Sequence, residues 1–307
     1  MTEPAVPPRP SQGPRPQDID PAAVRRQSQR LALAPNPPWL HAEVAQRMAE
    51  RLGFITLKPQ RVLDVTPTLG ASRDVLRAAY PKAEWLWHES NPGLAACARR
   101  QRALSWWQRL RTAPDGELTS LPAKPAVDLV WSNMALHASS DLPGELAAWQ
   151  SSLATDGFVM FSCLGPDSFI ELRALFTQKG FGRAAPDWWD MHDVGDLMLK
   201  AGFADPVMDQ ERLTLTWETP QRLLADLRAL GGNLAQTRFA GLRGRRWAAQ
   251  LNAALEGLRD ASGRLSLSLE VVYGHAFKAA PRLPVAVETR VSVEAMRATL
   301  KQGRSSD

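Results

Sequence analysis

The amino-acid sequence predicts an α/β protein with a doubly wound, mostly parallel sheet and helical insertions in its C-terminal half. Short apolar runs typical of buried strands stand at 61–65, 84–88, 127–132 and 158–163, and segments of helical spacing separate them. Strands that alternate with helices in this way favour βαβ units with parallel strands. The length of 307 residues suits one large domain of this kind or two small ones.

The first half of the sequence supplies the helices that such units require. The apolar positions of 41–52 fall on one helical face, and a helix at 72–80 ends before Pro81. Further helices are predicted at 92–102 and 144–153, each between two of the strand candidates. These helices would provide the crossover connections that the parallel strands require.

The second half has fewer and longer candidates. A helix is predicted at 190–201, a strand at 213–217, and another helix that Thr219 and Pro220 begin. The run at 265–278 alternates over fourteen residues and is the longest strand candidate. Two late strands separated by helices would complete the sheet with a mixed edge, which is common in large α/β sheets.

Composition excludes several classes of protein. The apolar fraction is 44% and the charged fraction 22%, which is typical of a globular protein and not of a disordered or fibrous one. The sequence lacks an apolar run long enough to span a bilayer and an apolar segment near the N-terminus. Two cysteines are too few for a disulfide framework or a zinc site. We therefore expect a cytoplasmic protein that is not bound to a membrane.

The ends of the chain differ from its middle. Seven of the 24 prolines lie in residues 1–21, so we predict a disordered Pro-rich tail over 1–38, one folded domain over 39–280 and a loose tail over 281–307. The net charge is +5, but residues 221–307 hold fourteen Lys and Arg against seven Asp and Glu. The Arg-rich stretch Arg238–Arg246 would attract an acidic partner, although a solvated helix end explains it equally well.

Polar residues follow successive strand candidates. Asp64 lies at the end of the first, Glu89 directly follows the second, and Ser132 and Asn133 stand at the end of the 127–132 run. Ligands of open α/β sheets bind beyond the carboxyl ends of the strands, and an acid after the second strand commonly binds a ribose. Each residue alone is more often a helix cap, but their joint placement favours a nucleoside site.

The loop after the first strand departs from a nucleotide motif. It contains only Gly70, because Thr66, Pro67 and Thr68 stand where glycines would let the backbone approach a ligand. It is not a P-loop, since no Gly-Lys-Ser/Thr follows. The five histidines are dispersed, so no metal site is expected, and no triad or Gly-x-Ser-x-Gly motif indicates a catalytic side chain.

Four longer segments identify a family. VDLVWSNMALHAS (127–139), DGFVMFSCLGPDSFIELR (156–173), DMHDVGDLMLKAGFADPVMD (190–209) and EVVYGHAF (270–277) closely resemble the malonyl-acyl-carrier-protein O-methyltransferases of biotin biosynthesis. These enzymes are class I S-adenosyl-L-methionine-dependent methyltransferases, and the resemblance covers about residues 60–278. It implies a Rossmann-like sheet of seven strands whose last strand is antiparallel.

The resemblance also implies where the methyl donor, S-adenosyl-L-methionine, would bind. The methionine part, the ribose and the transferring methyl group would lie in turn along the strand ends. The residues expected there are Asp64, Thr66 and Gly70 for the methionine part, Glu89 and Ser90 for the ribose, and Ser132 and Asn133 for the methyl group. The chain departs from the family in three places. Thr66 and Thr68 replace two glycines of the donor loop, and the acid expected after the third strand, beside the adenine, is not identifiable in 104–122. The stretch 30–48 also lacks the tyrosine expected where a lid helix covers the donor.

Candidates for contact with the acceptor are His192, Tyr273 and His275. Asp190 or Asp193 beside His192 would equally serve as a helix N-cap, and His275 would equally be a packed strand residue. The acceptor would be a small carboxylate or a group on an acidic acyl carrier protein, with no nucleic acid involved.

The predicted reaction is methylation of a free carboxylate, which needs no catalytic base because a carboxyl group titrates near about pH 4. One alternative is a methyltransferase-fold protein that has lost donor binding and acts as a binding or regulatory module. Another is an enzyme that keeps the donor but methylates a hydroxyl group or an arginine side chain.

Overall fold

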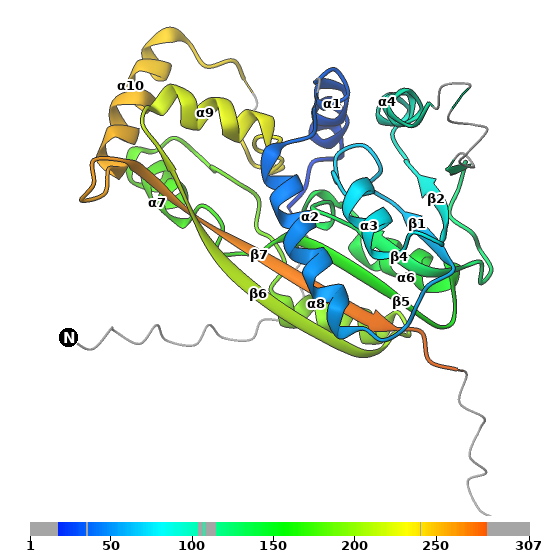
Figure 1. Cartoon of the computed structure of the whole chain (residues 1–307). Helices are drawn as coiled ribbons and strands as arrows, with labels where there is room; N and C mark the ends of the chain where they lie inside the picture. Colours follow the sequence, from blue (N-terminus) through cyan, green and yellow to red (C-terminus); the bar gives the residue numbers. More distant parts are fainter. Residues whose placement is uncertain (1–17, 35, 104–106, 108–114, 240, 281–307) are drawn as a thin grey trace, which may run out of the picture.

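The computed structural model describes residues 18–34, 36–103, 107, 115–239 and 241–280 of the chain (Figure 1). Its strands form one sheet of seven strands in the order β3-β2-β1-β4-β5-β7-β6. The strands are β1 Arg61–Asp64, β2 Glu84–His88, β3 Gly116–Leu118, β4 Val127–Ser132, β5 Leu153–Leu164, β6 Ala204–Trp217 and β7 Leu265–Phe277. The first five pair in parallel, and β7 is antiparallel to both β5 and β6. The predicted mostly parallel, doubly wound sheet with an antiparallel last strand is confirmed.

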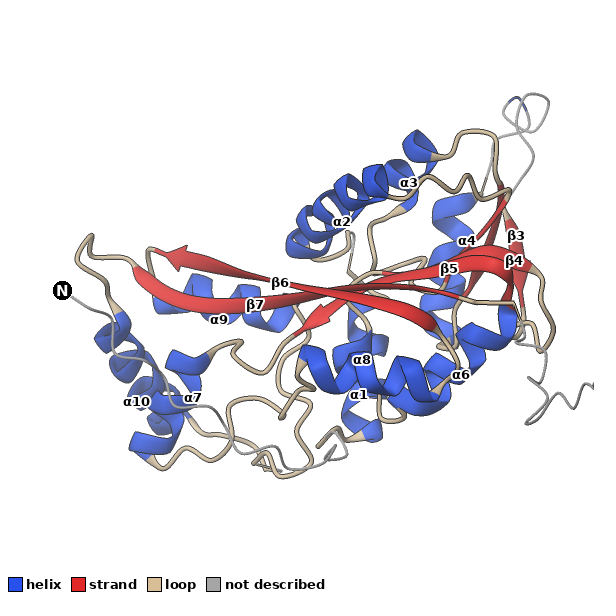
Figure 2. Ribbon diagram, turned by 90° about the horizontal axis from the view of Figure 1, so that it is seen from below, coloured by secondary structure: helices blue, strands red, loops and turns tan. Residues whose placement is uncertain are grey.

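Helices cover both faces of the sheet (Figure 2). They are α1 Pro21–Leu31, α2 Trp39–Arg51, α3 Arg73–Ala79, α4 Pro92–Arg102, α6 Leu142–Ser152, α7 Ile170–Lys179, α8 Met191–Lys200, α9 Pro220–Ala229 and α10 Arg245–Leu255, with short 3-10 turns η1 Leu52–Phe54, η2 Leu136–Ala138 and η3 Glu256–Leu258. Helices α2 and α3 lie on one face and α6 and α8 on the other. Strand side chains alternate between the two cores: Val62 packs toward α2 and Leu63 toward α6.

The long strands β6 and β7 extend beyond the rest of the sheet. Strand β5 pairs with the second half of β7 only, from Val271 to Phe277, whereas β6 pairs with β7 along its whole length, from Leu265. Residues 265–270 and their partners on β6 therefore form a two-stranded ribbon. Helices α9 and α10 lie in the connection between these two strands, and both pack near the ribbon with α7 (Figure 1).

Local sequence explains where several helices begin. The Asn91 side chain accepts hydrogen bonds from the N–H groups of Gly93 and Leu94, and Pro92 follows at the first helical position of α4. Thr219 caps α9 in the same way, as its sequence predicts. Asp190 accepts a hydrogen bond from His192 N at 2.8 Å, so the N-cap interpretation of this acid is confirmed.

Three predictions about the elements are corrected by the structure. Helix α1 lies inside the segment 1–38 that we predict to be disordered, and Ile19, Ala23 and Leu31 are buried there. Strand β3 is missing from the prediction, so 127–132 is the fourth strand and not the third. Strand β6 begins at Ala204 and not at 213. The predicted tail over 281–307 and residues 1–17 lie outside the described residues.

No helix in the described part of the chain is long and apolar enough to cross a membrane. Over the same residues, no three His, Cys, Asp or Glu side chains gather closely enough to hold a metal ion.

Candidate functional site at the carboxyl edge of the sheet

The topology brings the predicted donor residues to one edge of the sheet. Asp64 is the last residue of β1, where it lies opposite Trp87 of β2 and Trp131 of β4. Glu89 directly follows β2, and Ser132 ends β4. The order of the strands reverses between β1 and β4, and this is where open α/β sheets bind ligands.

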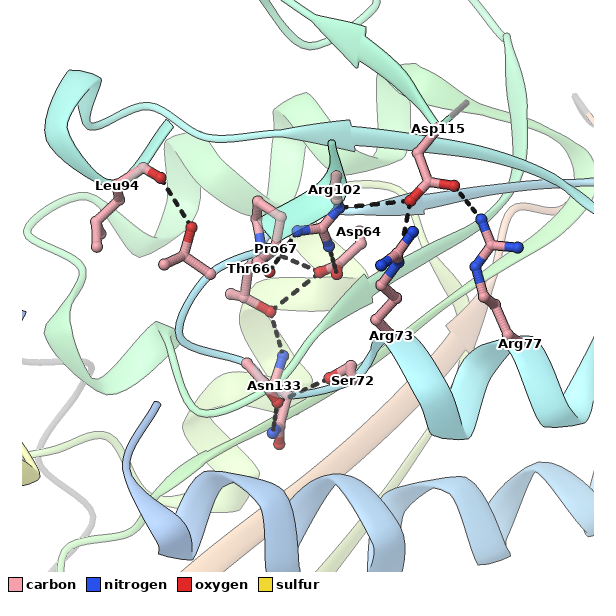
Figure 3. A network of polar contacts seen from close by, with 12 residues as sticks. Asp64, Thr66, Pro67, Ser72, Arg73, Arg77, Leu94, Arg102, Asp115 and Asn133 are labelled. Atoms are coloured by element: carbon pink, nitrogen blue, oxygen red, sulfur yellow. Dashed lines mark hydrogen bonds and ion pairs between the residues drawn. The ribbon is translucent and has the colours of Figure 1, made fainter. Parts of the chain in front are cut away.

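Hydrogen bonds of Thr66 and Thr68 hold the loop after β1 against neighbouring segments (Figure 3). Thr66 donates its backbone N–H and its hydroxyl to Asp64 Oδ1 at 2.9 and 3.3 Å, and its Oγ1 accepts the N–H of Asn133 at 3.0 Å. Thr68 Oγ1 donates to the carbonyl of Leu94 on α4 at 2.9 Å. Glycine has no hydroxyl group, so these side chains join the loop to β4 and α4 in a way that glycines could not.

Gly70 is the position in this loop where a side chain has no room. A Cβ atom there would lie 2.5 Å from Thr66 Oγ1 and 2.6 Å from the Thr66 carbonyl oxygen, below any tolerable contact. The Gly70 N–H donates to that same carbonyl at 2.8 Å. Gly70 therefore permits the tight turn that brings the loop back over Thr66.

A buried arginine joins the loop to α4. Arg102 Nη1 donates to the carbonyl of Pro67 at 2.8 Å, and its Nη2 lies 3.4 Å from Asp64 Oδ2. Its guanidinium also lies over the ring of Trp87, 5.6 Å from the centroid. Burial raises the pKa of Asp64 despite the attraction of Arg102, and burial lowers the pKa of Arg102 despite the attraction of Asp64 and Asp115.

Asp115 completes this cluster from the segment before β3. Its side chain is 5% exposed and pairs with Arg73 at 3.3 Å, with Arg102 at 3.6 Å and with Arg77 (Figure 3). From the sequence, no acid in 104–122 could be identified as the one expected after the third strand. Asp115 lies in this range, directly before β3, a strand that was not predicted. Its carboxylate binds arginines of α3 and α4 and so fixes the position of both helices.

Glu89 differs from Asp64 in having few partners. Within the described residues, it accepts one hydrogen bond, from Asn91 N at 3.2 Å. Burial, and to a smaller extent the negative charge of Asp64, raise the pKa of Glu89 to about 7. Its carboxylate oxygens keep lone pairs for further donors, while the neighbouring Ser90 is exposed.

Asn133 connects the loop, α2 and β5. Its amide donates to the carbonyls of His41 at 2.7 Å and Gly70 at 2.6 Å, and its Oδ1 accepts the hydroxyl of Ser162 at 2.6 Å. The Asn133 side chain is thus fully used in holding the wall of the site. The hydroxyl of Ser132 is buried and has no partner in the described part of the chain.

The structure does not bring the three predicted acceptor residues together. His192 is exposed near the start of α8. The hydroxyl of buried Tyr273 donates to Glu211 of β6 at 3.2 Å, and its ring lies under the guanidinium of Arg51. His275, further along β7, contacts the ring of Phe277. Their predicted contacts with substrate remain predictions.

A large apolar cavity lies next to the donor edge, on the side of β4 and β7. It has a volume of about 310 Å³, within the range of small-molecule pockets. Its lining includes Met134 and His137, one and four residues after Asn133, but none of the predicted site residues. Met134 adopts φ +54°, which turns the chain out of β4 toward the cavity, and its N–H donates to Ser162 O and Oγ.

Aromatic and leucine side chains of the C-terminal half form most of the cavity wall. They come from α7 and its N-cap, α9, α10, the ribbon, the segment between α7 and α8 and the segment between α9 and α10; the aromatic members are Phe169, Phe176, Phe181, Trp188, Phe239 and Trp247. Gln27 of α1 and the loop 231–234 also line it. The sequence showed the individual helices but not this cavity, because its walls come from segments more than 200 residues apart.

Two buried histidines lie where the cavity meets the donor edge. His41 of α2 donates from Nδ1 to the carbonyl of Leu69 at 2.8 Å. His137 of η2 is 7% exposed, and its Nδ1 is buried without a partner in the described residues. Burial lowers the pKa of His41 to about 4 and that of His137 to about 3, so both imidazoles are neutral at physiological pH.

Comparison with known proteins relates these features to named enzymes. No protein-family model matches the chain. The malonyl-[acyl-carrier protein] O-methyltransferase of Gallionella capsiferriformans is 39% identical over 273 residues, which cover 86% of this chain and 93% of that protein. The enzyme of the same name from Methylovorus is 37% identical, over 86% of this chain and 91% of that protein.

Two solved structures share the fold. The YcgJ protein from Bacillus subtilis superposes with a TM-score of 0.53 at 11% identity, over 78% of this chain and 99% of that chain. A putative methyltransferase from Bacillus halodurans has a TM-score of 0.50 at 10% identity, over 76% and 99% of the two chains. Identities this low establish the α/β methyltransferase fold and nothing finer.

Proposed function

Because this chain belongs to the malonyl-[acyl-carrier protein] O-methyltransferase family, we propose that it methylates the free carboxyl group of a malonyl thioester on an acyl carrier protein. The chain is an S-adenosyl-L-methionine-dependent methyltransferase. The observation that carries the choice of acceptor is the apolar cavity beside Asn133, since it adjoins the carboxylate-lined edge and has room for an acyl chain.

The residues at the edge fit the donor at its ribose end. Glu89 has a half-buried carboxylate with spare lone pairs, which is what a pair of ribose hydroxyl groups requires. Asp64, Thr66 and Gly70 would border the methionine part, with Asp64 already held by Arg102. Ser132 and Asn133 stand between this loop and the cavity, where the methyl group would pass.

The chemistry explains why no catalytic base is needed. S-adenosyl-L-methionine supplies a methyl group on a positively charged sulfur, and a carboxylate is already ionised at neutral pH. The protein has to orient the carboxylate oxygen and exclude water, effects that are worth about 7–11 kcal/mol in well-oriented reactions. The buried walls of the cavity and the fixed position of Asn133 suit both tasks.

The test is methyl transfer to defined thioesters. The purified chain is incubated with S-adenosyl-L-methionine and malonyl-acyl carrier protein, and the product is identified by intact-protein mass spectrometry as the methyl ester. Acetyl-acyl carrier protein is the matched control, because it has the same carrier and thioester but no free carboxyl group. Equal methylation of both, or of neither while S-adenosylhomocysteine binds, would contradict the proposed acceptor.

A further inference from the structure

Histidines and arginines are among the polar side chains that line the apolar cavity. His41 and His137 line it where it adjoins the loop after β1. Four arginines line the cavity elsewhere, from the segment after α7, from α9 and from the segment before α10: Arg183, Arg228, Arg238 and Arg243.

Acidic residues neutralise two of these four arginines. Arg183 pairs with Asp187 at 2.6 Å and Asp18 at 3.6 Å, and Arg238 pairs with Asp20 at 2.7 Å. No acid in the described part of the chain pairs with Arg228 or Arg243. Arg243 is held in place by the rings of Phe239 and Trp247 and by a hydrogen bond to the carbonyl of Phe181 at 2.7 Å. Two arginines that no acid among the described residues pairs with thus border an apolar cavity.

His137 supplies one hydrogen-bond donor to the cavity. Its Nδ1 is buried with no partner among the described residues, and a bare acceptor is less costly to bury unpaired than an N–H group. The single proton of the neutral ring therefore lies on Nε2. The carbonyl of His137 accepts the Trp188 indole N–H at 3.0 Å, which fixes the backbone that carries the ring.

We propose that this cavity binds the phosphopantetheine arm of the acceptor, with His137 holding the acyl carboxylate and Arg228 and Arg243 holding the phosphate. The arm has an anionic group at each end and an uncharged middle of short aliphatic segments joined by two amides, and the cavity combines largely apolar walls with a histidine and cationic donors. One N–H group from His137 binds one carboxylate oxygen and leaves the other free to accept the methyl group. This assignment rests on the proposed function and names the part of the acceptor that each residue contacts.

The proposed contact with the acyl carboxylate is tested by replacing His137. His137→Leu removes the donor and His137→Gln keeps an N–H group in its place. With malonyl-phosphopantetheine as acceptor, we expect kcat/KM to fall about tenfold or more in H137L, as for loss of a hydrogen bond to a charged group, and to be largely restored in H137Q. Unchanged binding of S-adenosylhomocysteine by titration calorimetry shows that both variants are folded. Parental kinetics in H137L would overturn the assignment.

The proposed contact with the phosphate is tested with a matched pair of variants on α9. Arg228→Ala removes a cavity arginine, and Arg222→Ala removes an exposed arginine that pairs with Asp226 and does not line the cavity. We expect R228A to raise KM several-fold for malonyl-phosphopantetheine but not for malonyl-pantetheine, which lacks the phosphate, and R222A to change neither. An equal effect of R228A on both acceptors would overturn the phosphate contact.

A binding measurement separates this inference from the proposed function. Calorimetry with malonyl-phosphopantetheine reports binding of the arm whether or not a methyl group is transferred. Binding that H137L and R228A weaken, without turnover, would leave the inference standing and overturn the function. Turnover that both variants leave unchanged would overturn the inference and leave the function standing.

Discussion

Glu89 is the residue whose protonation bears most directly on donor binding. Burial first, and the charge of Asp64 second, raise its pKa from 4.5 to about 7, so the free protein holds it partly protonated near neutral pH. The unfolded chain loses this proton around pH 4.5 and the folded protein only around pH 7, so this group lowers the stability of the fold as pH rises between these two values. The ionised form of Glu89 would bind the ribose hydroxyl groups, whereas the protonated form costs less to bury and favours the stability of the fold.

We predict that the affinity for S-adenosylhomocysteine rises about tenfold between about pH 6 and about pH 8, because a pKa near 7 takes the ionised fraction of Glu89 from about one tenth to about nine tenths. Titration calorimetry across this range measures it. Glu89→Gln should bind weakly at every pH and yet melt at a higher temperature than the parent at pH 8, since it buries no charge. A flat pH profile in the parent would contradict this role.

At the same scale, the sequence predicted which residues stand at the strand ends but not what they bind. Asp64 and Glu89 were identified because strand ends can be found from hydrophobic runs. The partners of Thr66 and Thr68 are Asn133 and the carbonyl of Leu94, which lie far away in the sequence. The spacing of residues within one loop carries no information on such distant contacts. From the sequence, the threonines could therefore only be described as residues that stand in place of glycines.

Among the elements, α1 joins the two halves of the site. Its Arg30 donates to the carbonyls of Gly231 at 2.9 Å and Arg228 at 3.1 Å, at the end of α9. Just before the helix, Asp20 N donates to the carbonyl of Leu234 at 2.8 Å, and α1 also packs against α4. The helix thus lies between α9, which lines the cavity, and α4, which follows the end of β2 (Figure 1).

Arg30→Ala should loosen this cover without unfolding the domain. Two hydrogen bonds at about 0.5–1.5 kcal/mol each would make local opening of α1 several-fold more frequent. Hydrogen exchange of the α1 amides measures the change, and Arg25→Ala on the exposed side of the same helix is the control. Equal exchange in both variants would show that these bonds do not hold the helix.

The elements that the sequence missed share a physical cause. Helix α1 follows a Pro-rich segment and buries only a few side chains, against a loop more than 200 residues away. Strand β3 has three residues, too few for a pattern. The first half of β6 contains Pro206 and several charged residues, which weaken its β signal, and it is held by its pairing with β7.

For the whole molecule, the distribution of charge favours an acidic macromolecular partner. Residues 221–307 carry an excess of seven positive charges while the rest of the chain is slightly negative. The exposed Arg245 and Arg246 at the start of α10 belong to the basic part, near the cavity that we assign to the arm. Such a field attracts a carrier protein and has little effect on a small substrate.

We therefore expect KM for malonyl-acyl carrier protein to rise steeply when ionic strength increases from about 0.1 M to about 1 M, because the Debye length falls from about 10 Å to about 3 Å. KM for malonyl-pantetheine, measured in the same buffers, corrects for effects of salt on the enzyme itself. A constant ratio of the two KM values would show that long-range attraction does not contribute.

At this scale the sequence was most informative. Alternation of strand and helix predicted the doubly wound sheet, and the segments 127–139, 156–173, 190–209 and 270–277 identified the family that the comparisons establish. The cavity was not predicted, because it depends on how far β6 and β7 extend past β5. That distance is fixed by strand register, which hydrophobic patterns do not specify for long two-stranded segments.

The extension of β6 and β7 also places the two binding regions on different parts of the chain. The described residues between Trp217 and Leu265, including α9 and α10, form one connection within a hairpin, and several of them line the cavity while the ends of β1 and β2 lie elsewhere. Substitutions in that connection should therefore change the fit of the acceptor and leave the residues expected at the methyl donor in place.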